Sequence, residues 1–549
     1  QGWCSYPCRV SKGDVVIMSS QDAKLLALAK GTVNYCCESK IVIILEKDMK
    51  SLSEWSNQVF RLDRISYSGS SRLCLTNLVK LADNEPHIAK LRDIIVEKSS
   101  PSFLSGLKKE SIARCRHILR PLNFQQRKVL FKCLMANDYV LIRGMPGCGK
   151  TSAIVSLIRT LVVLGYSVLV TSHTHSAVDN ILLKLLDHGI EFLRIGQKNR
   201  VHSKILPYTD SCLLSCVSDI EGVKKIYENY NVVACTCLGV NHALFSKRLF
   251  DFCVMDEACQ VVQPISIGPL FYAKKFVLVG DPKQLPPVVR SEKAKALGMD
   301  TPLFSRLQQE GSCFDLGIQY RMNSEVMKLA NDLTYDGALD CADENVANRT
   351  LQLNEVELTL QEEWIQEVLC PDLSKSVMFI DTVGLHSSRN SPRKSIAISE
   401  TETNIAIQIL RSLNQMSFNM EEVGVIAPYR AQTRHLRENF ISAGLPSIEV
   451  NTVDQFQGRD KEVIIVSCTK SSRCSAREEG DILHDFRRLN VATTRAKVKL
   501  IIIGHSMSLR EFKPFKQLLQ LLRHDQFLSL RLVDSNYVID RESRPLFIS

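Results

Sequence analysis

The stretch Gly144-Met-Pro-Gly-Cys-Gly-Lys-Thr151 decides the fold of this 549-residue chain. It fits the pattern G-x-x-x-x-G-K-[ST], in which glycines let backbone N–H groups wrap around a phosphate. An apolar strand at 139–142 precedes the stretch, and a helix with one apolar face follows it. This order predicts a phosphate-binding loop at the positive end of a helix. We expect Lys150 to reach the β- and γ-phosphates and Thr151 to hold Mg²⁺.

Polar groups also follow two further apolar strands. The strand at 252–255 leads into Asp256 and Glu257, and the strand at 276–279 leads into a turn that ends at Gln284. The carboxyl ends of parallel strands share one edge of a sheet, where α/β proteins place their ligands. A buried acid pair is costly unless it is paired or bound to a metal. We therefore expect Asp256 to hold Mg²⁺, Glu257 to polarise the attacking water and Gln284 to sense the γ-phosphate.

Short apolar strands alternate with helical stretches along most of the chain, which is the pattern of parallel α/β sheets. The predicted strands are 139–142, 168–170, 231–234, 252–255 and 276–279, and then 377–380, 423–427, 463–467 and 499–504. The stretch 341–375 is acidic and polar, and we predict an insertion or loop there.

The pattern before the first α/β series differs. Residues 1–65 contain short β-branched runs that predict a small barrel or sandwich, and the next segment is helical and charged. The predicted division of the chain is 1–65 as a small β-barrel, 66–120 as a helical stalk or linker, 121–310 as a first P-loop ATPase domain and 311–549 as a second α/β domain.

Composition excludes several classes of protein. Hydrophobic residues make up 45% and charged residues 23% of the chain, which excludes a collagen, a coiled-coil rod and a largely disordered chain. No apolar stretch approaches the roughly 20 residues of a membrane span. Residues 1–12 lack the apolar region of a secretory signal. The net charge of +10 permits a nucleic-acid partner but does not prove one. The missing initial Met suggests a fragment or an incomplete gene model.

The 19 cysteines include no C-x-x-C pair. We expect most of them to be small buried hydrophobic residues of a reduced protein. Cys4 and Cys8 are four residues apart, and for these two the remnant of a metal or cluster site remains an alternative.

The order of the motifs resembles that of superfamily 1 helicases. Asn123-Phe-Gln-Gln126 resembles the adenine-reading segment, with Gln126 on the base. Gln319-Tyr320-Arg321 resembles the segment whose Tyr stacks on adenine and whose Arg touches the γ-phosphate. The segments 450–460 and 487–497 resemble motifs V and VI, with Arg495 as the arginine finger.

This resemblance implies an α/β fold of two tandem RecA-like P-loop domains with parallel sheets, preceded by the small β-barrel and the helical stalk. ATP would lie between the two domains, and Arg321 and Arg495 would meet the γ-phosphate when the cleft closes. The implied catalytic residues are Lys150, Asp256, Glu257, Gln284, Arg321 and Arg495. The implied nucleotide contacts are Gln126, Gly144, Pro146, Gly147, Cys148, Gly149, Lys150, Thr151, Ser152, Tyr320, Gly458 and Asp460, with Thr151 and Asp256 on Mg²⁺.

Within that superfamily, the chain most resembles the eukaryotic DNA replication ATP-dependent helicase/nuclease family over about 10–510. The strings that carry the resemblance are 174–184, 250–257, 263–265, 268–271, 319–324, 333–337 and 346–348. The resemblance implies a 5′–3′ helicase or translocase on single-stranded DNA, acting in Okazaki flap processing and end resection. It also implies flap DNA as substrate, a nuclear location with the mitochondrion as a second possibility, and a single-strand-binding protein as a candidate partner.

The chain departs from that family in several places. We find no nuclease carboxylate set, so nuclease activity and an iron–sulfur cluster are expected only of a full-length parent. Cys148, Cys259 and Thr493 stand where Thr or Ser, Ser, and Ile are usual. These swaps are small, and a loop that binds through backbone N–H groups should tolerate Cys148, so we do not infer inactivity.

The resemblance also implies where a single strand of nucleic acid would bind. The implied contacts are Ser172, Thr174 and Thr236 from the first domain and Pro428, Tyr429, Arg430 and Thr452 from the second. Two alternatives remain open at this point. One is a related RNA helicase of the senataxin or nonsense-mediated-decay branch, because the ATP motifs are shared. The other is a clamp that binds ATP without turnover, against which the complete catalytic set argues.

Overall fold

The computed structural model describes residues 10, 14–21, 27–36, 40–45, 59–64, 69–217, 219–385, 398–445, 448–469 and 482–541. The chain divides into two units, residues 1–82 and 83–549. Cys4 and Cys8 lie outside the described residues. No helix of the described part is long and apolar enough to cross a membrane.

The first unit contains a four-stranded antiparallel sheet in the order β3-β2-β1-β4. Its strands are β1 (Val15–Ser20), β2 (Ala29–Cys36), β3 (Ile41–Leu45) and β4 (Phe60–Arg64). Alternate residues of β2 are buried over Ala29–Val33, as expected of strands with one covered face. Helix α1 (Gly69–Leu81) follows the sheet.

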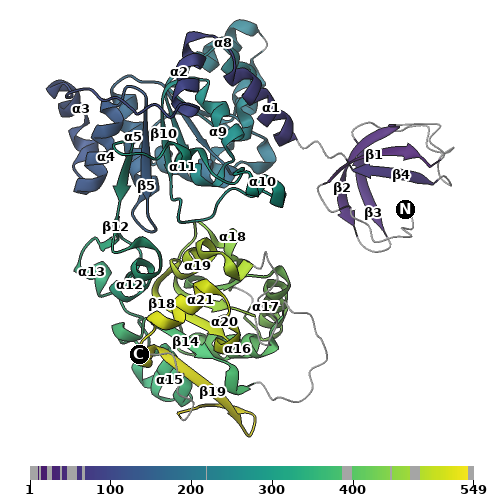
Figure 1. Ribbon diagram of the computed structural model, residues 1–549, viewed down its shortest axis with the longest axis vertical. Helices are drawn as coiled ribbons and strands as arrows, with labels where there is room; N and C mark the ends of the chain where they lie inside the picture. Colours follow the sequence, from purple (N-terminus) through teal and green to yellow (C-terminus); the bar gives the residue numbers. More distant parts are fainter. Residues whose placement is uncertain are drawn as a thin grey trace. The chain divides into compact units, whose positions relative to one another are not determined.

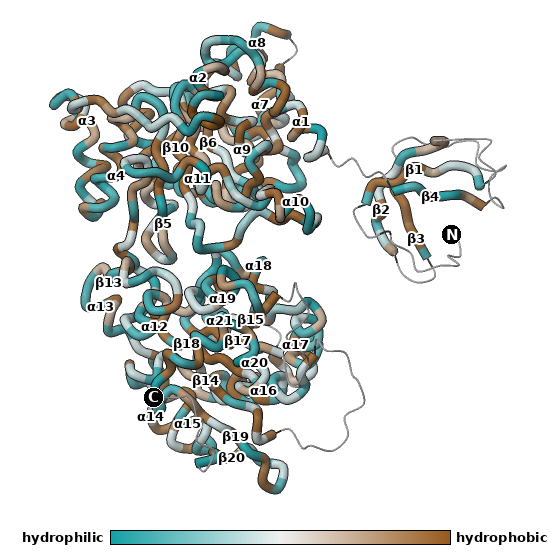
Figure 2. The backbone as a smooth tube through the Cα atoms, viewed as in Figure 1, coloured by the Kyte–Doolittle hydropathy of each residue, from teal (hydrophilic) through white to brown (hydrophobic). Residues whose placement is uncertain are grey.

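A seven-stranded parallel sheet forms the first half of the second unit, in the order β11-β5-β10-β9-β6-β8-β7. Figure 1 labels β5 and β10 of this sheet. Its strands are β5 (Tyr139–Gly144), β6 (Val168–Ser172), β7 (Phe192–Arg194), β8 (Val232–Thr236), β9 (Phe250–Asp256), β10 (Ala273–Gly280) and β11 (Cys313–Leu316). Every residue of β6 and β8 is buried, and strands such as β10 carry the hydrophobic colour in Figure 2. Burial on both faces requires such continuous apolar strands.

Ten helices of the described chain accompany this sheet. They are α2 (Pro86–Ile95), α3 (Lys109–Leu119), α4 (Phe124–Met135), α5 (Lys150–Val163), α6 (His175–Leu186), α7 (Asp210–Leu213), α8 (Ile220–Asn229), α9 (Gln263–Leu270), α10 (Glu292–Ala296) and α11 (Leu303–Leu307). Helices α3, α4 and α6 pack against α5, the helix that follows the phosphate-binding loop.

A second seven-stranded sheet has the order β16-β15-β17-β18-β14-β19-β20, and its strands are parallel except for the last pair. They are β14 (Val377–Asp381), β15 (Val423–Ala427), β16 (Glu449–Thr452), β17 (Lys461–Ser467), β18 (Ala496–Gly504), β19 (Phe527–Val533) and β20 (Asn536–Ile539). The accompanying helices are α16 (Glu400–Gln415), α17 (Arg430–Ser442), α18 (Val453–Phe456), α19 (Phe486–Thr493), α20 (Ser506–Leu509) and α21 (Lys513–Leu521). The predicted fold class, an antiparallel β domain followed by two parallel-sheet domains, is confirmed.

The stretch 341–375, predicted to be an insertion or loop, is not a loop. Helices α13 (Glu344–Ala347), α14 (Glu355–Thr359) and α15 (Glu363–Leu369) occupy it, after helix α12 (Ser324–Ala330) and a small sheet of β12 (Ile318–Gln319) and β13 (Asp340–Cys341). Trp364 is only 1% exposed and belongs to the core of the second large sheet. Helices this short show too few turns for an apolar period to be visible.

A buried ion pair fastens α6 to β7. The Arg194 Nε donates to the Asp179 Oδ1 at 3.0 Å, and the two side chains are 0% and 5% exposed. Arg194 also donates to the Ile195 carbonyl oxygen at 2.7 Å. The Asp179 Oδ2 accepts the backbone N–H of His202 at 2.8 Å. Such a fully hydrogen-bonded pair is costly to break from one side, because the remaining charge stays buried.

We therefore expect Arg194→Ala to lower the free energy of unfolding by about 3–5 kcal/mol, measured by urea denaturation. The control is Arg143→Ala, whose ion pair with Asp315 has side chains 28% and 46% exposed. That control should cost no more than about 1 kcal/mol. Equal losses in the two variants would contradict a stabilising role for the buried pair.

Candidate active site

The loop between β5 and α5 needs glycine at two positions. Gly147 and Gly149 have φ of +74° and +73°, in the left-handed region. A Cβ on Gly147 would lie 2.7 Å from the Arg321 Cβ, and one on Gly149 would lie 2.9 Å from the Gln126 Nε2. The loop therefore has the open backbone that a phosphate needs, and the second domain approaches it directly.

Lys150 is the first residue of α5, and its Nζ donates to the Gly144 carbonyl oxygen at 2.9 Å. Burial works to lower the pKa of Lys150, but the carboxylates of Glu257 and Asp281 outweigh burial and raise the pKa. The ammonium group therefore stays charged in the position where a phosphate would meet it.

The acid pair follows the buried strand β9 as predicted. Asp256 ends β9 and is 7% exposed, and its Oδ1 accepts the backbone N–H of Glu257 at 2.9 Å. Burial and the Glu257 charge raise the pKa of Asp256 to about 7, with Lys150 opposing them. Glu257 has φ of +51°, a strained backbone for a residue with a side chain. Such strain is concentrated at functional sites.

Two arginines from the second half of the unit face this loop. Arg321 donates from Nε to the Asp460 Oδ2 at 2.9 Å and from Nη1 to the Thr494 carbonyl oxygen at 3.0 Å. Burial raises the pKa of Asp460, but Arg321 and Lys497 outweigh it and lower that pKa. Arg495 is 2% exposed, and burial together with Arg321 lowers its pKa to about 9.

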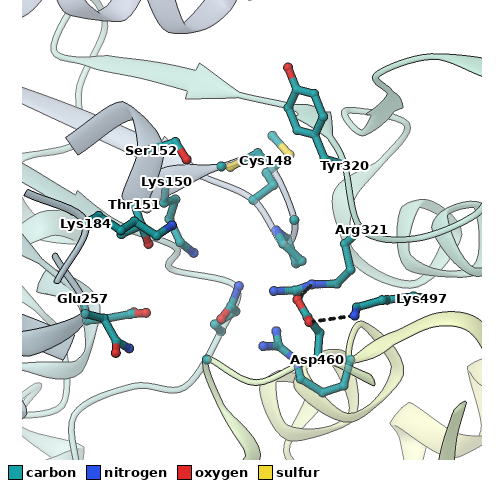
Figure 3. A pocket seen from close by; sticks show the side chains of 18 of the residues that line it. Cys148, Lys150, Thr151, Ser152, Lys184, Glu257, Tyr320, Arg321, Asp460 and Lys497 are labelled. Atoms are coloured by element: carbon teal, nitrogen blue, oxygen red, sulfur yellow. Dashed lines mark hydrogen bonds and ion pairs between the residues drawn. The ribbon is translucent and has the colours of Figure 1, made fainter. Parts of the chain in front are cut away.

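These groups enclose one cavity of about 550 Å³ (Figure 3). Figure 3 shows Lys150, Thr151 and Lys184 on one side and Arg321, Asp460 and Lys497 on the other. The structure brings the following predicted residues to its wall: Pro146, Gly147, Cys148, Gly149, Lys150, Thr151, Ser152, Glu257, Gln284, Tyr320, Arg321, Gly458, Asp460 and Arg495. The predicted residues Gln126, Gly144 and Asp256 are not part of the wall.

Gln126 lies behind the loop instead of facing the cavity. Its Oε1 accepts the backbone N–H of Asn123 at 3.2 Å, and the Asn123 Oδ1 accepts the backbone N–H of Gln126 at 2.8 Å. This is a capping box at the start of α4. The Gln126 Nε2 donates to the Cys148 carbonyl oxygen at 3.4 Å. In this arrangement Gln126 supports the phosphate-binding loop from behind.

Tyr320 is the predicted stacking residue, and it is 43% exposed at the wall. Its backbone N–H donates to the Gly147 carbonyl oxygen at 2.9 Å, and its hydroxyl oxygen accepts from the Asn123 Nδ2 at 2.9 Å. Two hydrogen bonds therefore fix an exposed aromatic ring beside the loop, a position that suits a planar base.

The sequence reasoning missed part of the wall. The missed residues are Met145, Asn180, Leu183, Lys184, Arg349 and Lys497. Asn180 and Lys184 are four residues apart on α6, so they share one helical face. Arg349 directly follows the distinctive string 346–348, and that string was the available signal for it.

The residues predicted to contact nucleic acid lie at the carboxyl edges of the two large sheets. Ser172 and Thr236 end the paired strands β6 and β8, and Thr174 caps α6. Ser172 and Thr236 are only 0% and 6% exposed, whereas Thr174 is exposed. On the second sheet, Thr452 ends β16 and is 7% exposed.

The segment Pro428, Tyr429 and Arg430 leads from β15 into α17. Arg430 is the first residue of α17 and is exposed, whereas Pro428 and Tyr429 are half-buried. The two sheets therefore present their candidate nucleic-acid residues at corresponding edges. Thr174 and Arg430 are exposed and therefore accessible to a nucleic-acid strand, whereas Ser172, Thr236 and Thr452 are buried.

A buried carboxyl group supports this second edge. Glu402 is 0% exposed, and its Oε2 accepts from the Ser467 Oγ at 2.6 Å and from the Thr469 backbone N–H at 2.9 Å. The Gln432 Nε2 donates to the same Ser467 Oγ at 3.0 Å. The network ties α16 and α17 to the end of β17. Burial raises the pKa of Glu402 to about 7 despite these hydrogen bonds.

Two α/β domains, with a P-loop in the first and two arginines of the second on the same cavity, define the class of superfamily 1 helicase motors. The Dna2 Rift barrel domain family matches residues 6–65, and two AAA domain families match 121–292 (as 121–221 and 217–292) and 299–507. The matching family models therefore agree with the assignment to helicase motors.

Curated relatives share the name DNA replication ATP-dependent helicase/nuclease DNA2. The Mus musculus protein is 39% identical over 94% of this chain and 50% of its own length, and the Xenopus laevis protein is 39% identical over 93% and 49%. The Saccharomyces cerevisiae protein is 34% identical over 85% and 31%. This chain matches the helicase portion of that helicase/nuclease family, and it spans about half the length of the relatives from mouse and frog.

A solved structure of the PRRSV helicase aligns with 98% of this chain and 73% of that chain. Its sequence is 12% identical and its TM-score is 0.36, values too low to bear on function.

We expect Lys150→Ala to reduce ATP turnover by about 100-fold or more, because one preorganised charge at the γ-phosphate is lost. Steady-state phosphate release measures the effect. Lys295→Ala is the matched control, since Lys295 is exposed on α10 and pairs only with Glu292 at 2.8 Å among the described residues. Turnover of Lys150→Ala at the control level would contradict the assignment of this cavity.

We also expect Glu402→Gln to change how stability depends on pH. A carboxyl group whose pKa is raised on folding stabilises the fold fully below its unfolded pKa, and that contribution is lost as pH rises to about 7. The wild type should therefore lose about 3 kcal/mol relative to Glu402→Gln between pH 4.5 and 7.

Urea midpoints at pH 5 and pH 8 measure this difference. Glu438→Gln, at an exposed position on α17, is the matched control. A gap between Glu402→Gln and the wild type that is the same at both pH values would contradict the titration of Glu402 in this range.

Proposed function

We propose that the chain is an ATP-dependent DNA helicase or translocase that moves 5′ to 3′ on single-stranded DNA. The observation that carries the proposal is the single cavity lined by the P-loop, Glu257, Arg321 and Arg495. Membership of the helicase/nuclease family supports DNA as the nucleic acid. The chain spans about half of those relatives, so the family's whole-protein activity enters here as a proposal.

ATP binds with its phosphates on the loop and its base against the exposed ring of Tyr320. Lys150 neutralises the β- and γ-phosphates. Glu257 orients and polarises the water that attacks the γ-phosphorus, and the bond to the β–γ bridging oxygen breaks to give ADP and phosphate. Arg321 and Arg495 stabilise the charge that spreads over the transferred group, an effect worth roughly 10³–10⁵ in rate for such arginines.

The hydroxyl of Thr151 and the carboxylate of Asp256 would hold Mg²⁺, which supplies charge neutralisation at the phosphates when bound. Both are oxygen ligands of the type this cation prefers. The fit rests on the chemistry of these donors, a hydroxyl at the start of α5 and a buried carboxylate at the end of β9.

Movement on DNA follows from the placement of the ATP site between two domains. Lys150 and Arg495 lie on opposite domains, and the γ-phosphate is the group that both contact. Hydrolysis removes that shared contact, so the two sheet edges separate. The proposed strand contacts are Ser172, Thr174, Thr236, Pro428, Tyr429, Arg430 and Thr452. If the two edges bind and release the DNA strand in turn as the cleft closes and opens, each cycle moves the motor along the strand.

The wider role is also a proposal. We place the chain in replication, at Okazaki flaps, and in repair, at resected ends, with a nuclear location and a single-strand-binding protein as partner. The proposed domains follow the predicted division 1–65, 66–120, 121–310 and 311–549, except that β11 (Cys313–Leu316) pairs with β5 and so belongs with the first large sheet. An iron–sulfur cluster is expected only if a nuclease domain is present in a longer parent protein. Among the described residues, no group of three or more His, Cys, Asp or Glu could hold a metal.

The test is ATP hydrolysis at fixed low salt with no nucleic acid, with single-stranded DNA and with single-stranded RNA. Salt is held constant because phosphate contacts make binding steeply salt-dependent. We expect stimulation by DNA of about tenfold or more and little by RNA, since the family acts in DNA replication. Unwinding of duplexes with a 5′ or a 3′ single-stranded tail then reports the polarity.

The Lys150→Ala variant supplies the background rate in every arm. Equal or greater stimulation by RNA would replace the proposal with the RNA-helicase branch. Hydrolysis absent under all three conditions, with ATP binding retained, would identify a nucleic-acid clamp instead.

A further inference from the structure

A chain of buried hydrogen bonds crosses between the two α/β domains at Tyr335. The Tyr335 hydroxyl donates to the Asp281 Oδ2 at 2.7 Å. The Tyr335 hydroxyl oxygen also accepts from the Asn490 Nδ2 at 2.8 Å. The three side chains are 6%, 2% and 2% exposed. Burial and the neighbouring Asp281 raise the pKa of Tyr335 well above its usual value, so the hydroxyl stays a donor.

On the first domain, this chain ends at a residue of the ATP cavity. The Gln284 Nε2 donates to the same Asp281 Oδ2 at 3.0 Å, and the Asp281 Oδ1 accepts the backbone N–H of Lys283 at 3.0 Å. Gln284 lines the cavity, whereas Tyr335 does not. One carboxylate oxygen of Asp281 therefore receives the amide of Gln284 and the hydroxyl of Tyr335 together.

On the second domain, the chain ends at the helix that leads to the arginine finger. Asn490 lies on α19, five residues before Arg495, and its carbonyl oxygen accepts from the Thr494 Oγ1 at 2.7 Å. The Asn490 Nδ2 also donates to the Lys283 carbonyl oxygen at 2.8 Å. Helix α19 is thus fastened to the loop that carries Gln284.

The backbone around Tyr335 is shaped to hold the ring in this place. A π-helical turn, Asn331–Tyr335, follows α12 and ends at Asp336, whose φ is +53°. The Asn331 side chain clamps the turn through two hydrogen bonds of 3.0 Å with the backbone of Leu339. Single π-helical turns occur frequently at functional sites. The ring belongs to the same apolar cluster as Leu285 of the first domain.

We propose that Tyr335 is a positioning residue for ATP hydrolysis, which orients Gln284 through Asp281 and couples it to the helix of Arg495 through Asn490. The inference rests on the ATPase activity proposed above and adds a residue outside the cavity to it. A carboxylate that accepts two directed hydrogen bonds fixes the geometry of both donors. Without the hydroxyl, Asp281 can turn, and the amide of Gln284 turns with it.

The experiment is Tyr335→Phe, which removes one oxygen and keeps the ring in the apolar cluster. We expect kcat of DNA-stimulated hydrolysis to fall by about tenfold while KM for ATP changes by no more than about twofold, because the ring does not line the cavity. Tyr166→Phe is the matched control. Its ring packs edge-on against Phe252 at 5.5 Å and is 40% exposed within the first domain.

A double-variant cycle separates positioning from plain stability. In the Gln284→Ala background, Tyr335→Phe should cause no further loss of kcat, since Tyr335 acts through Gln284. Additive losses would overturn the proposal, and so would an unchanged kcat in Tyr335→Phe alone. If Tyr335→Phe does not fold, Asn490→Ala must show the same split between kcat and KM, and a matching fall in both parameters would overturn the proposal.

The wild type decides between this inference and the proposed function. A wild type without hydrolysis refutes the ATPase and this inference with it. A wild type stimulated by DNA, with a Tyr335→Phe variant that matches Tyr166→Phe, refutes only the role of Tyr335.

Discussion

The close approach of the second domain to the phosphate-binding loop is the constraint on which the rest of the site depends. The peptide at Tyr320 donates to the Gly147 carbonyl oxygen at 2.9 Å, and Arg321 comes so near that Gly147 has no room for a Cβ. A side chain there would push the two domains apart. This backbone contact places Tyr320 and Arg321 at the wall of the cavity.

The charges around the cavity explain why it suits a polyphosphate. Six basic side chains line it against two acidic ones, Glu257 and Asp460. The basic residues are Lys150, Lys184, Arg321, Arg349, Arg495 and Lys497. Part of this charge is balanced internally, since Asp460 pairs with Arg321 at 2.9 Å and with Lys497 at 3.6 Å. The remaining excess favours an anion between the domains and disfavours close approach without one.

The sequence predicted the fold class and most of the cavity wall for one physical reason. In motifs such as 144–151, closely spaced residues lie between a strand and a helix. The residues that form the site are therefore neighbours in the sequence, and a local pattern is enough to identify them. Gln126 shows where this fails, because the Asn123–Gln126 spacing serves equally well as a capping box. The segment 341–375 fails because helices of four to seven residues reveal no period. The Asp281–Tyr335–Asn490 chain joins residues 54 and 155 positions apart, and no local pattern records such contacts.

Helix α6 carries residues of both candidate sites, the nucleotide cavity and the proposed nucleic-acid contact. Thr174 caps its N-terminus at the edge assigned to the strand, and Asn180 and Lys184 of the same helix line the ATP cavity. At 1.5 Å of rise per residue, these two side chains lie about 9 and 15 Å along the axis from the cap. The helix cannot tilt freely, because the buried Asp179–Arg194 pair fastens it to β7. If a nucleic-acid strand binds at Thr174 as proposed, the contact and two residues of the cavity wall lie on one helix with no loop between them.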